Sequence, residues 1–231
     1  MTSLKKKVLI IEPHSDDSLI AAGGYLLKYK DVLDLHFCLV TASDLNMHHG
    51  PVSRQTRLDE YQKFVDSFGG KWLRPTVLGQ QLPLDRESKL DQVERSFLVK
   101  FFEQAILDVK PDVLMIMGPS FHHDHTIVYE AVIAATRPTF KFCPEAIYVM
   151  ENSTYVHKLY PGSDLTPNLY VELTEDVIKE KIRLFDSIFT SQKRPKENSL
   201  SDEGMFRWAE YRGLEARCRF AEAFYQYYAR L

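Results

Sequence analysis

The sequence lacks the features that mark disulfide-stabilised, membrane-spanning and nucleic-acid-binding proteins. Its three cysteines, Cys38, Cys143 and Cys218, lie far apart and form neither a CxxC metal motif nor a disulfide framework. It contains no run of about 18 apolar residues, so no transmembrane helix is expected. Its formal net charge is −3, whereas nucleic-acid binders normally carry a basic surplus. These absences predict a protein of the reducing cytoplasm, with no nucleic-acid partner and no stable membrane insertion.

The chain also lacks a signal-peptide core and internal divisions. MTSLKKKVLII begins basic and turns apolar, but Glu12 and His14 interrupt the apolar stretch after a few residues. No repeat, low-complexity tract or linker separates one part of the sequence from another. The 231 residues therefore predict a single domain over residues 1–231.

What the sequence does contain is an alternation of short apolar runs with segments of helical period. Such interleaving is typical of βαβ units and predicts a largely parallel, layered α/β sheet. Strands are expected over residues 8–11, 35–40, 76–78, 112–117 and 146–150, and helices over residues 19–29, 57–68, 93–109, 125–135, 175–189 and 205–228.

Two polar clusters follow expected strands directly. PHSDDS comes after the run that ends at Ile11, and HHDH comes shortly after DVLMIM. Because functional loops of parallel sheets lie at the carboxyl ends of the strands, both clusters are expected at one edge. Asp124 is also well placed to cap the helix that follows. Either cluster alone is explained equally well as a solvated capping loop, but together they hold four of the eight histidines.

The spacing within the clusters suits a metal site. A catalytic zinc ion typically has three protein ligands and one open position. His14 and Asp17 are three residues apart, as are His122 and His125, so each pair can share one helical face. The most economical assignment puts His14, Asp17 and His125 on the metal and leaves Asp16 and His122 for proton transfer.

These motifs resemble those of a known family. PHSDDSLIAAGG is similar to the (A/P)HPDDE…GG signature of the LmbE-like, or PIG-L, zinc-dependent N-acetylglucosamine deacetylases, and HHDH is similar to their HPDH element. RLDEYQKFVDSFG resembles the family's R-x-x-E helix. The segments LGQQLPLD, PNLYVELT and RGLEARCRFAEAF resemble later family segments in the same order, so the resemblance spans nearly the whole chain.

The resemblance implies a fold, a cofactor and a set of site residues. The fold would be a three-layer Rossmann-like sandwich with a mainly parallel sheet, holding one zinc ion per chain. Iron and manganese also suit such ligands. The implied roles are zinc binding by His14, Asp17 and His125, general base for Asp16, assistance of the oxyanion or leaving group by His122, orientation of His122 by Asp124, and substrate contact by Arg57.

The sequence departs from the family pattern at two places that bear on substrate. Ser18 stands where the family has glutamate after the paired aspartates, and TASD stands where a TNGE-like segment is expected. For Arg57, the alternative to substrate contact is a surface pair with Glu60 one turn on. His157 is a candidate for a substrate-recognition loop. The glycine pair Gly23 and Gly24 is expected to permit close helix–sheet packing.

Three functions are compatible with this reading. The first is a zinc-dependent hydrolase that removes an N-acyl group, expected to be acetyl, from a small-molecule amino sugar or its conjugate. The second is a metal-dependent hydratase of a small unsaturated carboxylic acid on the same fold. The third is a non-catalytic sugar-binding protein, against which the complete His/Asp/His set argues. The aromatic-rich tail FAEAFYQYYARL has helical spacing and suits either core or an interface between copies of the chain.

Overall fold

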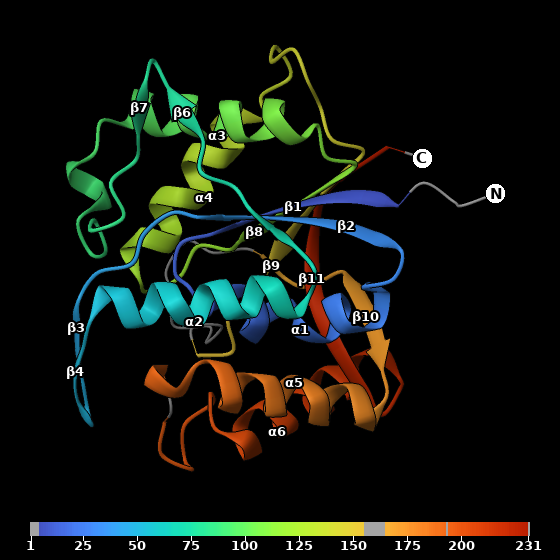
Figure 1. The fold of residues 1–231 in the computed structure, drawn as a ribbon. Helices are drawn as coiled ribbons and strands as arrows, with labels where there is room; N and C mark the ends of the chain where they lie inside the picture. The colour runs from blue at the N-terminus through green and yellow to red at the C-terminus, as the bar shows by residue number, and fades with distance from the viewer. Residues whose placement is uncertain (1–4, 155–164, 193, 231) are drawn as a thin grey trace.

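A seven-stranded sheet, in the order β10-β11-β9-β8-β1-β2-β5, forms the centre of the computed structural model, which describes residues 5–154, 165–192 and 194–230 (Figure 1). All of its neighbouring strands are parallel except where β11 pairs with β9 and β10. The strands are β1 (Lys6–Glu12), β2 (Leu33–Leu39), β5 (Lys71–Trp72), β8 (Val113–Met117), β9 (Ala146–Met150), β10 (Leu169–Leu173) and β11 (Phe220–Ala229).

Strand β1 is apolar because both of its faces are covered. Val8 and Ile10 pack into one hydrophobic cluster and Leu9 and Ile11 into another, and all four are 0% exposed. A parallel strand buried on both faces is a continuous apolar run rather than an alternating one. β1 therefore lies in the interior of the sheet, between β2 and β8.

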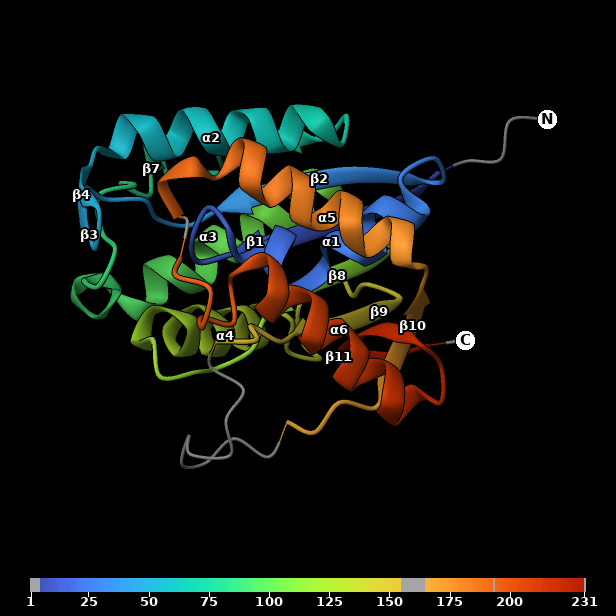
Figure 2. The same cartoon turned by 90° about the horizontal axis from the view of Figure 1, so that it is seen from below.

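Helices cover both faces of the sheet and make three layers. One face carries α1 (Asp17–Tyr29), α2 (Arg54–Ser67), α5 (Glu175–Ile188) and α6 (Asp202–Ala216), and the other carries α3 (Arg95–Val109) and α4 (His123–Ala135) (Figure 1). From below, α5 lies along α1, and α6 lies over β11 (Figure 2). This is the mainly parallel α/β sandwich that the sequence predicts.

Short elements lie in the connections after β2, β5 and α5. They are the hairpin strands β3 (Leu45–Met47) and β4 (Gly50–Val52), the hairpin strands β6 (Thr76–Val77) and β7 (Gln80–Gln81), and the 3₁₀ turns η1 (Leu90–Gln92) and η2 (Thr190–Gln192). The expected strand at residues 76–78 is thus present, but it belongs to a separate two-stranded hairpin.

The helix expected over residues 205–228 is wrong beyond Ala216. Arg217 takes a left-handed conformation with φ of 58°, which ends α6, and residues 220–229 form β11. The aromatic residues of the tail fit a helical period. However, β11 pairs on both sides, with Phe224 opposite Met150 of β9 and Leu169 of β10. These pairing partners are distant in the chain, so a local period could not reveal them.

Gly24 lets α1 approach the sheet closely, as expected. A Cβ atom at this position would lie 2.4 Å from Leu173 Cδ1 and 3.0 Å from the Glu222 carboxyl group. The backbone N–H of Gly24 donates to Glu222 Oε1 at 2.7 Å, and Lys181 Nζ donates to the same oxygen at 2.7 Å. A buried ion pair from α5 and β11 therefore fixes α1 at its glycine.

Among the residues described, no helix is long and apolar enough to cross a membrane. His157, the candidate for a substrate-recognition loop, lies outside the described residues.

Candidate metal centre

The two polar clusters meet at one edge of the sheet because β1 and β8 are parallel neighbours. Ile11 pairs with Ile116 near the carboxyl ends of these strands, so the loops that follow leave the sheet side by side. The first loop leads into α1, which begins at Asp17, and the second leads into α4, which begins at His123. The topology therefore brings together residues more than 100 positions apart in sequence.

His14, Asp17 and His125 form a compact, buried triad of potential ligands. His14 Nδ1 lies 3.1 Å from His125 Nε2 and 3.4 Å from Asp17 Oδ2, and His125 Nε2 lies 3.4 Å from Asp17 Oδ1. The three residues are 6%, 2% and 1% exposed. Such a group could hold a metal ion.

The spacing of these donors fits a tetrahedral metal. Donors about 2.0–2.1 Å from a zinc ion lie about 3.3 Å from one another, so three of them would leave one position open. Two imidazole nitrogens at 3.1 Å also need a proton or a cation between them, because both cannot be bare acceptors at that distance. The nitrogen and oxygen donors suit zinc and several other divalent metals.

A second group, His14, His122 and Asp124, also brings its ligand atoms within 4.8 Å of one another. In this group Asp124 Oδ2 lies 3.2 Å from His14 Nε2 and accepts a hydrogen bond from Ser88 N at 2.7 Å. The His14 ring can thus face the first triad through Nδ1 and Asp124 through Nε2. That is the arrangement in which a carboxylate orients a metal-binding histidine from behind.

Asp124 differs in two respects from the sequence expectation. It does not cap α4, because His122 occupies the capping position and Asp124 lies inside the first turn. Its carboxylate also lies nearer to His14, at 3.2 Å, than to His122, at 3.9 Å. The assignment of Asp124 to orient His122 stays a prediction.

Two residues that the sequence reading missed hold the triad in place. Ser120 Oγ lies 2.9 Å from His125 Nδ1, and Asn152 Nδ2 donates to Asp17 Oδ1 at 3.3 Å. Both are buried at the carboxyl ends of strands, Ser120 after β8 and Asn152 after β9. Their place at the same edge as the polar clusters is the signal that could have found them.

The charges in the triad perturb one another strongly. Burial alone would lower the pKa of His14, but the carboxylates of Asp124 and Asp17 raise it to about 10. Burial alone would raise the pKa of Asp17, yet His125 and His14 hold it well below its usual value. Burial, together with His14 and His125, lowers the pKa of His122 to about 4. The His122 imidazole is therefore neutral near pH 7 and can donate one N–H.

Asp16 lies beside the triad but outside it. It occupies the capping position of α1, with φ of −105° and ψ of −10°, and its side chain makes no capping hydrogen bond. Burial and the neighbouring Asp17 raise the pKa of its carboxyl group. A carboxylate with a raised pKa next to a metal site is a suitable proton acceptor.

Arg57 is buried rather than exposed at the protein surface. It is 1% exposed, and its Nη1 donates to the Glu87 carboxylate and to the backbone oxygen of Ser43. The alternative of a surface pair with Glu60 is wrong, because Glu60 is buried and accepts from Ser191 N and Ser191 Oγ. The role of Arg57 in contacting substrate stays a prediction.

Glu12, the last residue of β1, is a buried carboxyl group that the sequence reading did not assign. Tyr61 Oη donates to its Oε1 at 2.5 Å, and Ser18 N donates to its Oε2 at 3.0 Å. Burial raises its pKa to about 8. An acidic residue at the end of an otherwise apolar buried strand was the available signal.

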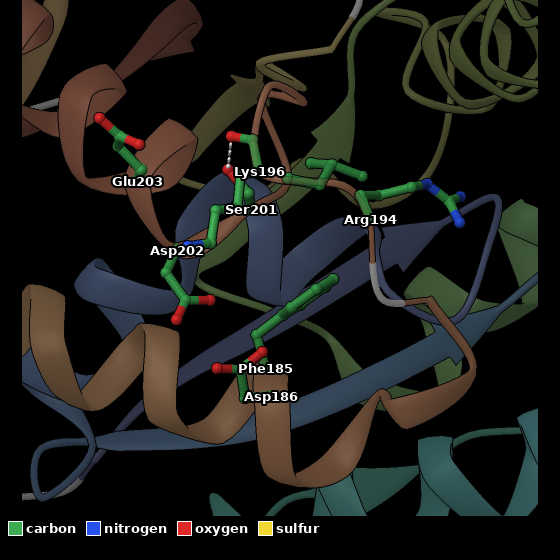
Figure 3. Close-up of a pocket in the computed structure, with 8 residues that line it drawn as sticks. Phe185, Asp186, Arg194, Lys196, Ser201, Asp202 and Glu203 are labelled. Carbon is green, nitrogen blue, oxygen red and sulfur yellow. Dashed lines mark hydrogen bonds between the residues drawn. The ribbon is translucent and has the colours of Figure 1, made fainter.

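A pocket of about 330 Å³ lies between α5 and α6 (Figure 3). Near it, a hydrogen bond of 3.1 Å between Thr154 Oγ1 and Ser199 Oγ joins the loop before α6 to the segment that follows β9. None of the predicted site residues that the structure describes lines this pocket. Its walls are Phe185, Asp186, Arg194, Lys196, Leu200, Ser201, Asp202 and Glu203.

Comparison with known proteins adds relatives in sequence and in structure. The family model PIG-L, described as GlcNAc-PI de-N-acetylase, matches residues 9–136. A diacetylchitobiose deacetylase from Thermococcus kodakarensis is 28% identical over 199 residues, which cover 77% of this chain and 67% of that protein.

Two solved structures share the fold along nearly the whole chain. N,N'-diacetylchitobiose deacetylase from Pyrococcus horikoshii superposes with a TM-score of 0.63 at 22% identity, covering 96% of this chain and 83% of that one. The 4-carboxy-2-hydroxymuconate hydratase GalB from Pseudomonas putida KT2440 superposes with a TM-score of 0.69 at 17% identity, covering 98% of each chain. At these identities the two structures establish the fold alone.

Proposed function

Because the chain belongs to the PIG-L family, whose model covers more than half of its length, we propose that it is a metal-dependent hydrolase of N-acetylated amino sugars or their conjugates. The observation that carries the proposal is the buried His14, Asp17 and His125 triad, whose donor atoms lie 3.1–3.4 Å apart. The curated relative, a diacetylchitobiose deacetylase, supports the same class of substrate.

In this proposal His14, Asp17 and His125 hold one zinc ion, and iron or manganese is an alternative with the same ligands. When bound, the metal would polarise the acyl carbonyl group and lower the pKa of a water molecule. Ser120 and Asn152 would keep the His125 ring and the Asp17 carboxylate in their orientations. Such supporting contacts normally tune metal affinity.

The remaining residues would move protons and stabilise charge. Asp16 would accept a proton from the water molecule as the water oxygen attacks the amide carbon. It would then donate this proton to the amide nitrogen as the C–N bond breaks. The products would be acetate and the free amine. The neutral His122 imidazole would donate its N–H to the carbonyl oxygen as negative charge develops there. Asp124 would support this group of histidines through His14.

An acetate-release screen tests the proposal. Purified protein with added zinc would be given N-acetyl sugars, their nucleotide and glycoside conjugates, and diacetylchitobiose. We expect acetate release by the wild type and loss of it in His125→Ala. His36→Ala is the matched control, because His36 lies on β2, pairs with Asp34 and is outside the triad. Retained activity in His125→Ala would contradict the proposal.

The hydratase alternative gives a different result in the same screen. It would require hydration of a small unsaturated carboxylic acid and no acetate release from any N-acetyl sugar. A hydratase would also need free basic groups to bind the substrate carboxylate. Arg57, which is buried, is already paired with Glu87.

A further inference from the structure

The start of α1 differs from the starts of three other helices in this protein. Ser53, Thr174 and Ser201 cap α2, α5 and α6 in the usual way, with an extended backbone and a side-chain oxygen that accepts a hydrogen bond from the helix. Asp16 occupies the same position before α1, and aspartate is among the best capping residues. Its backbone is helical instead of extended, however, and its side chain does not cap.

The side chain of Glu12, from strand β1, accepts a capping hydrogen bond that Asp16 does not make. Glu12 Oε2 accepts from Ser18 N, the second residue of α1, at 3.0 Å. This N–H is one of the two that a capping side chain ordinarily satisfies. The hydroxyl of Tyr61 on α2 holds the other Glu12 oxygen at 2.5 Å, and Glu12 is 0% exposed. The Glu12 carboxyl group is therefore held by hydrogen bonds from two elements.

The Asp17 carboxylate also accepts a backbone hydrogen bond in this segment. Its Oδ2 accepts from His14 N at 2.9 Å, which closes the loop between β1 and α1 onto the triad. Of the acidic residues Glu12, Asp16 and Asp17, two therefore bind backbone N–H groups of this segment. Asp16 is the residue whose carboxylate does not cap the helix that it precedes.

We propose that Glu12 is a positioning residue that caps α1 in place of Asp16 and so keeps the Asp16 carboxylate available for proton transfer. The inference rests on the proposed function, in which Asp16 is the general base. The contact lies where the sequence departs from the family motif. Position 18 carries serine instead of glutamate, and its backbone N–H donates to the Glu12 side chain.

Three substitutions of Glu12 test the inference by changing its acceptor oxygen or the distance of that oxygen from Ser18 N. Glu12→Gln keeps an acceptor oxygen for Ser18 N and is expected to keep most of the wild-type kcat. Glu12→Ala removes the acceptor, and Glu12→Asp withdraws it by one methylene. Both should lower kcat by about 10- to 100-fold with little change in KM, because a displaced catalytic group costs turnover rather than binding.

The control is Glu222→Gln, which alters a buried carboxylate that binds α1 further along, at Gly24 and Tyr25. It should leave kcat per folded molecule unchanged, even if the protein becomes less stable. A loss of kcat in this variant equal to that in Glu12→Ala would overturn the inference, because general loosening of α1 would then explain both. If Glu12→Ala does not fold, Glu12→Asp carries the comparison with Glu12→Gln.

A crystal structure of metal-free Glu12→Ala or Glu12→Asp provides a readout that does not need activity. We expect the Asp16 carboxylate to lie about 3 Å from Ser18 N or Leu19 N, in the capping position. An unmoved Asp16, or a Glu12→Gln variant as slow as Glu12→Ala, would overturn the positioning role. The absence of acetate release by the wild type would instead overturn the proposed function, so the two failures are distinguishable.

Discussion

The imidazole of His14 connects both parts of the candidate metal centre. Its Nδ1 faces His125 and Asp17, and its Nε2 faces Asp124 on the opposite side. Asp124 also accepts a hydrogen bond from Ser88 N. Through Asp124, the His14 ring is therefore linked to a loop that is distant from both motifs in the sequence. Replacement of this one ring would therefore remove a proposed ligand and would also take the His14 partner away from the buried Asp124 carboxylate, which would keep only its other contacts.

Asp16→Asn is expected to abolish most turnover while sparing the metal. The amide cannot accept the proton of the attacking water, and loss of a general base typically costs a factor on the order of 100 or more. Asp16 is outside the ligand triad, so the zinc content of the purified protein should match that of the wild type. Acetate release and metal analysis on the same samples check both parts. Wild-type turnover in Asp16→Asn would contradict the role of general base.

Cys38 provides a test of pH dependence away from the site. It is 0% exposed in β2, and burial raises the pKa of its thiol to about 12 from an ordinary value of 9.0. The thiol of the unfolded chain therefore ionises first, so the free energy of unfolding should fall as pH rises from about 9 towards 12. Urea unfolding of the wild type and Cys38→Ala across this range measures the difference in their free energies of unfolding. This difference should become smaller as pH rises.

Alkylation gives an independent check on the same thiol. At pH 8.5 iodoacetamide should label Cys143, which is exposed, and leave Cys38 unmodified in the folded protein. In urea both should react. Rapid labelling of Cys38 without denaturant would contradict the burial that raises its pKa.

At the scale of elements, the packing of α1 depends on a buried ion pair from two other elements. Lys181 Nζ of α5 donates to the carbonyl oxygen of Ile20 and to Glu222 of β11, and Glu222 accepts from two backbone N–H groups of α1. The helix that begins the candidate site is thus joined to strands and helices from the far end of the sequence.

Lys181→Met is expected to lower the free energy of unfolding by about 3–5 kcal/mol, because it leaves the Glu222 carboxylate buried without its counter-charge. The matched control is Lys179→Met on the same helix, which breaks an exposed pair with Glu175 and should change stability little. Urea unfolding of the two variants compares them directly. Equal effects would show that the buried pair is not what holds α1.

Elements with their own apolar period could be predicted from sequence, and elements defined by distant pairing could not. The strand at residues 146–150 and the helices near α2 and α5 match the structure closely, since each has a clear pattern and stop signals. β11 was expected as a helix because its aromatic spacing is ambiguous, and only its pairing with β9 and β10 decides its conformation.

The same distinction applies to the site. The triad of His14, Asp17 and His125 could be proposed because its members lie in short polar motifs after strands. Asn152 and Glu12 carry no motif, and the contacts of Asn152 with Asp17 and of Glu12 with Tyr61 arise only when β9 and α2 are packed in place. A single sequence contains their identities but not the contacts that give them a role.

At the scale of the whole molecule, metal binding and folding should be linked. A ligand that binds only the folded state at about 100 times its Kd raises the free energy of unfolding by about 2.7 kcal/mol. We expect this increase when zinc is added to chelator-treated protein, measured by urea unfolding. His125→Ala should show no such increase, since it removes one of the three proposed ligands. Equal stabilisation of this variant would place the zinc elsewhere.

The position of β11 in the sheet has a consequence for synthesis on the ribosome. β11 follows every other strand in the chain, yet it lies between β9 and β10, and β10 has no other neighbour among the strands described. A nascent chain that has emerged as far as α6 therefore carries β10 without a hydrogen-bonding partner and β9 as a temporary edge. The residues of the metal centre leave the ribosome early, but Glu222 reaches α1 only after translation has passed β10, α5 and α6. Until β11 is inserted, the sheet edge at β9 is unpaired, and the nascent protein must avoid association with other chains through this edge.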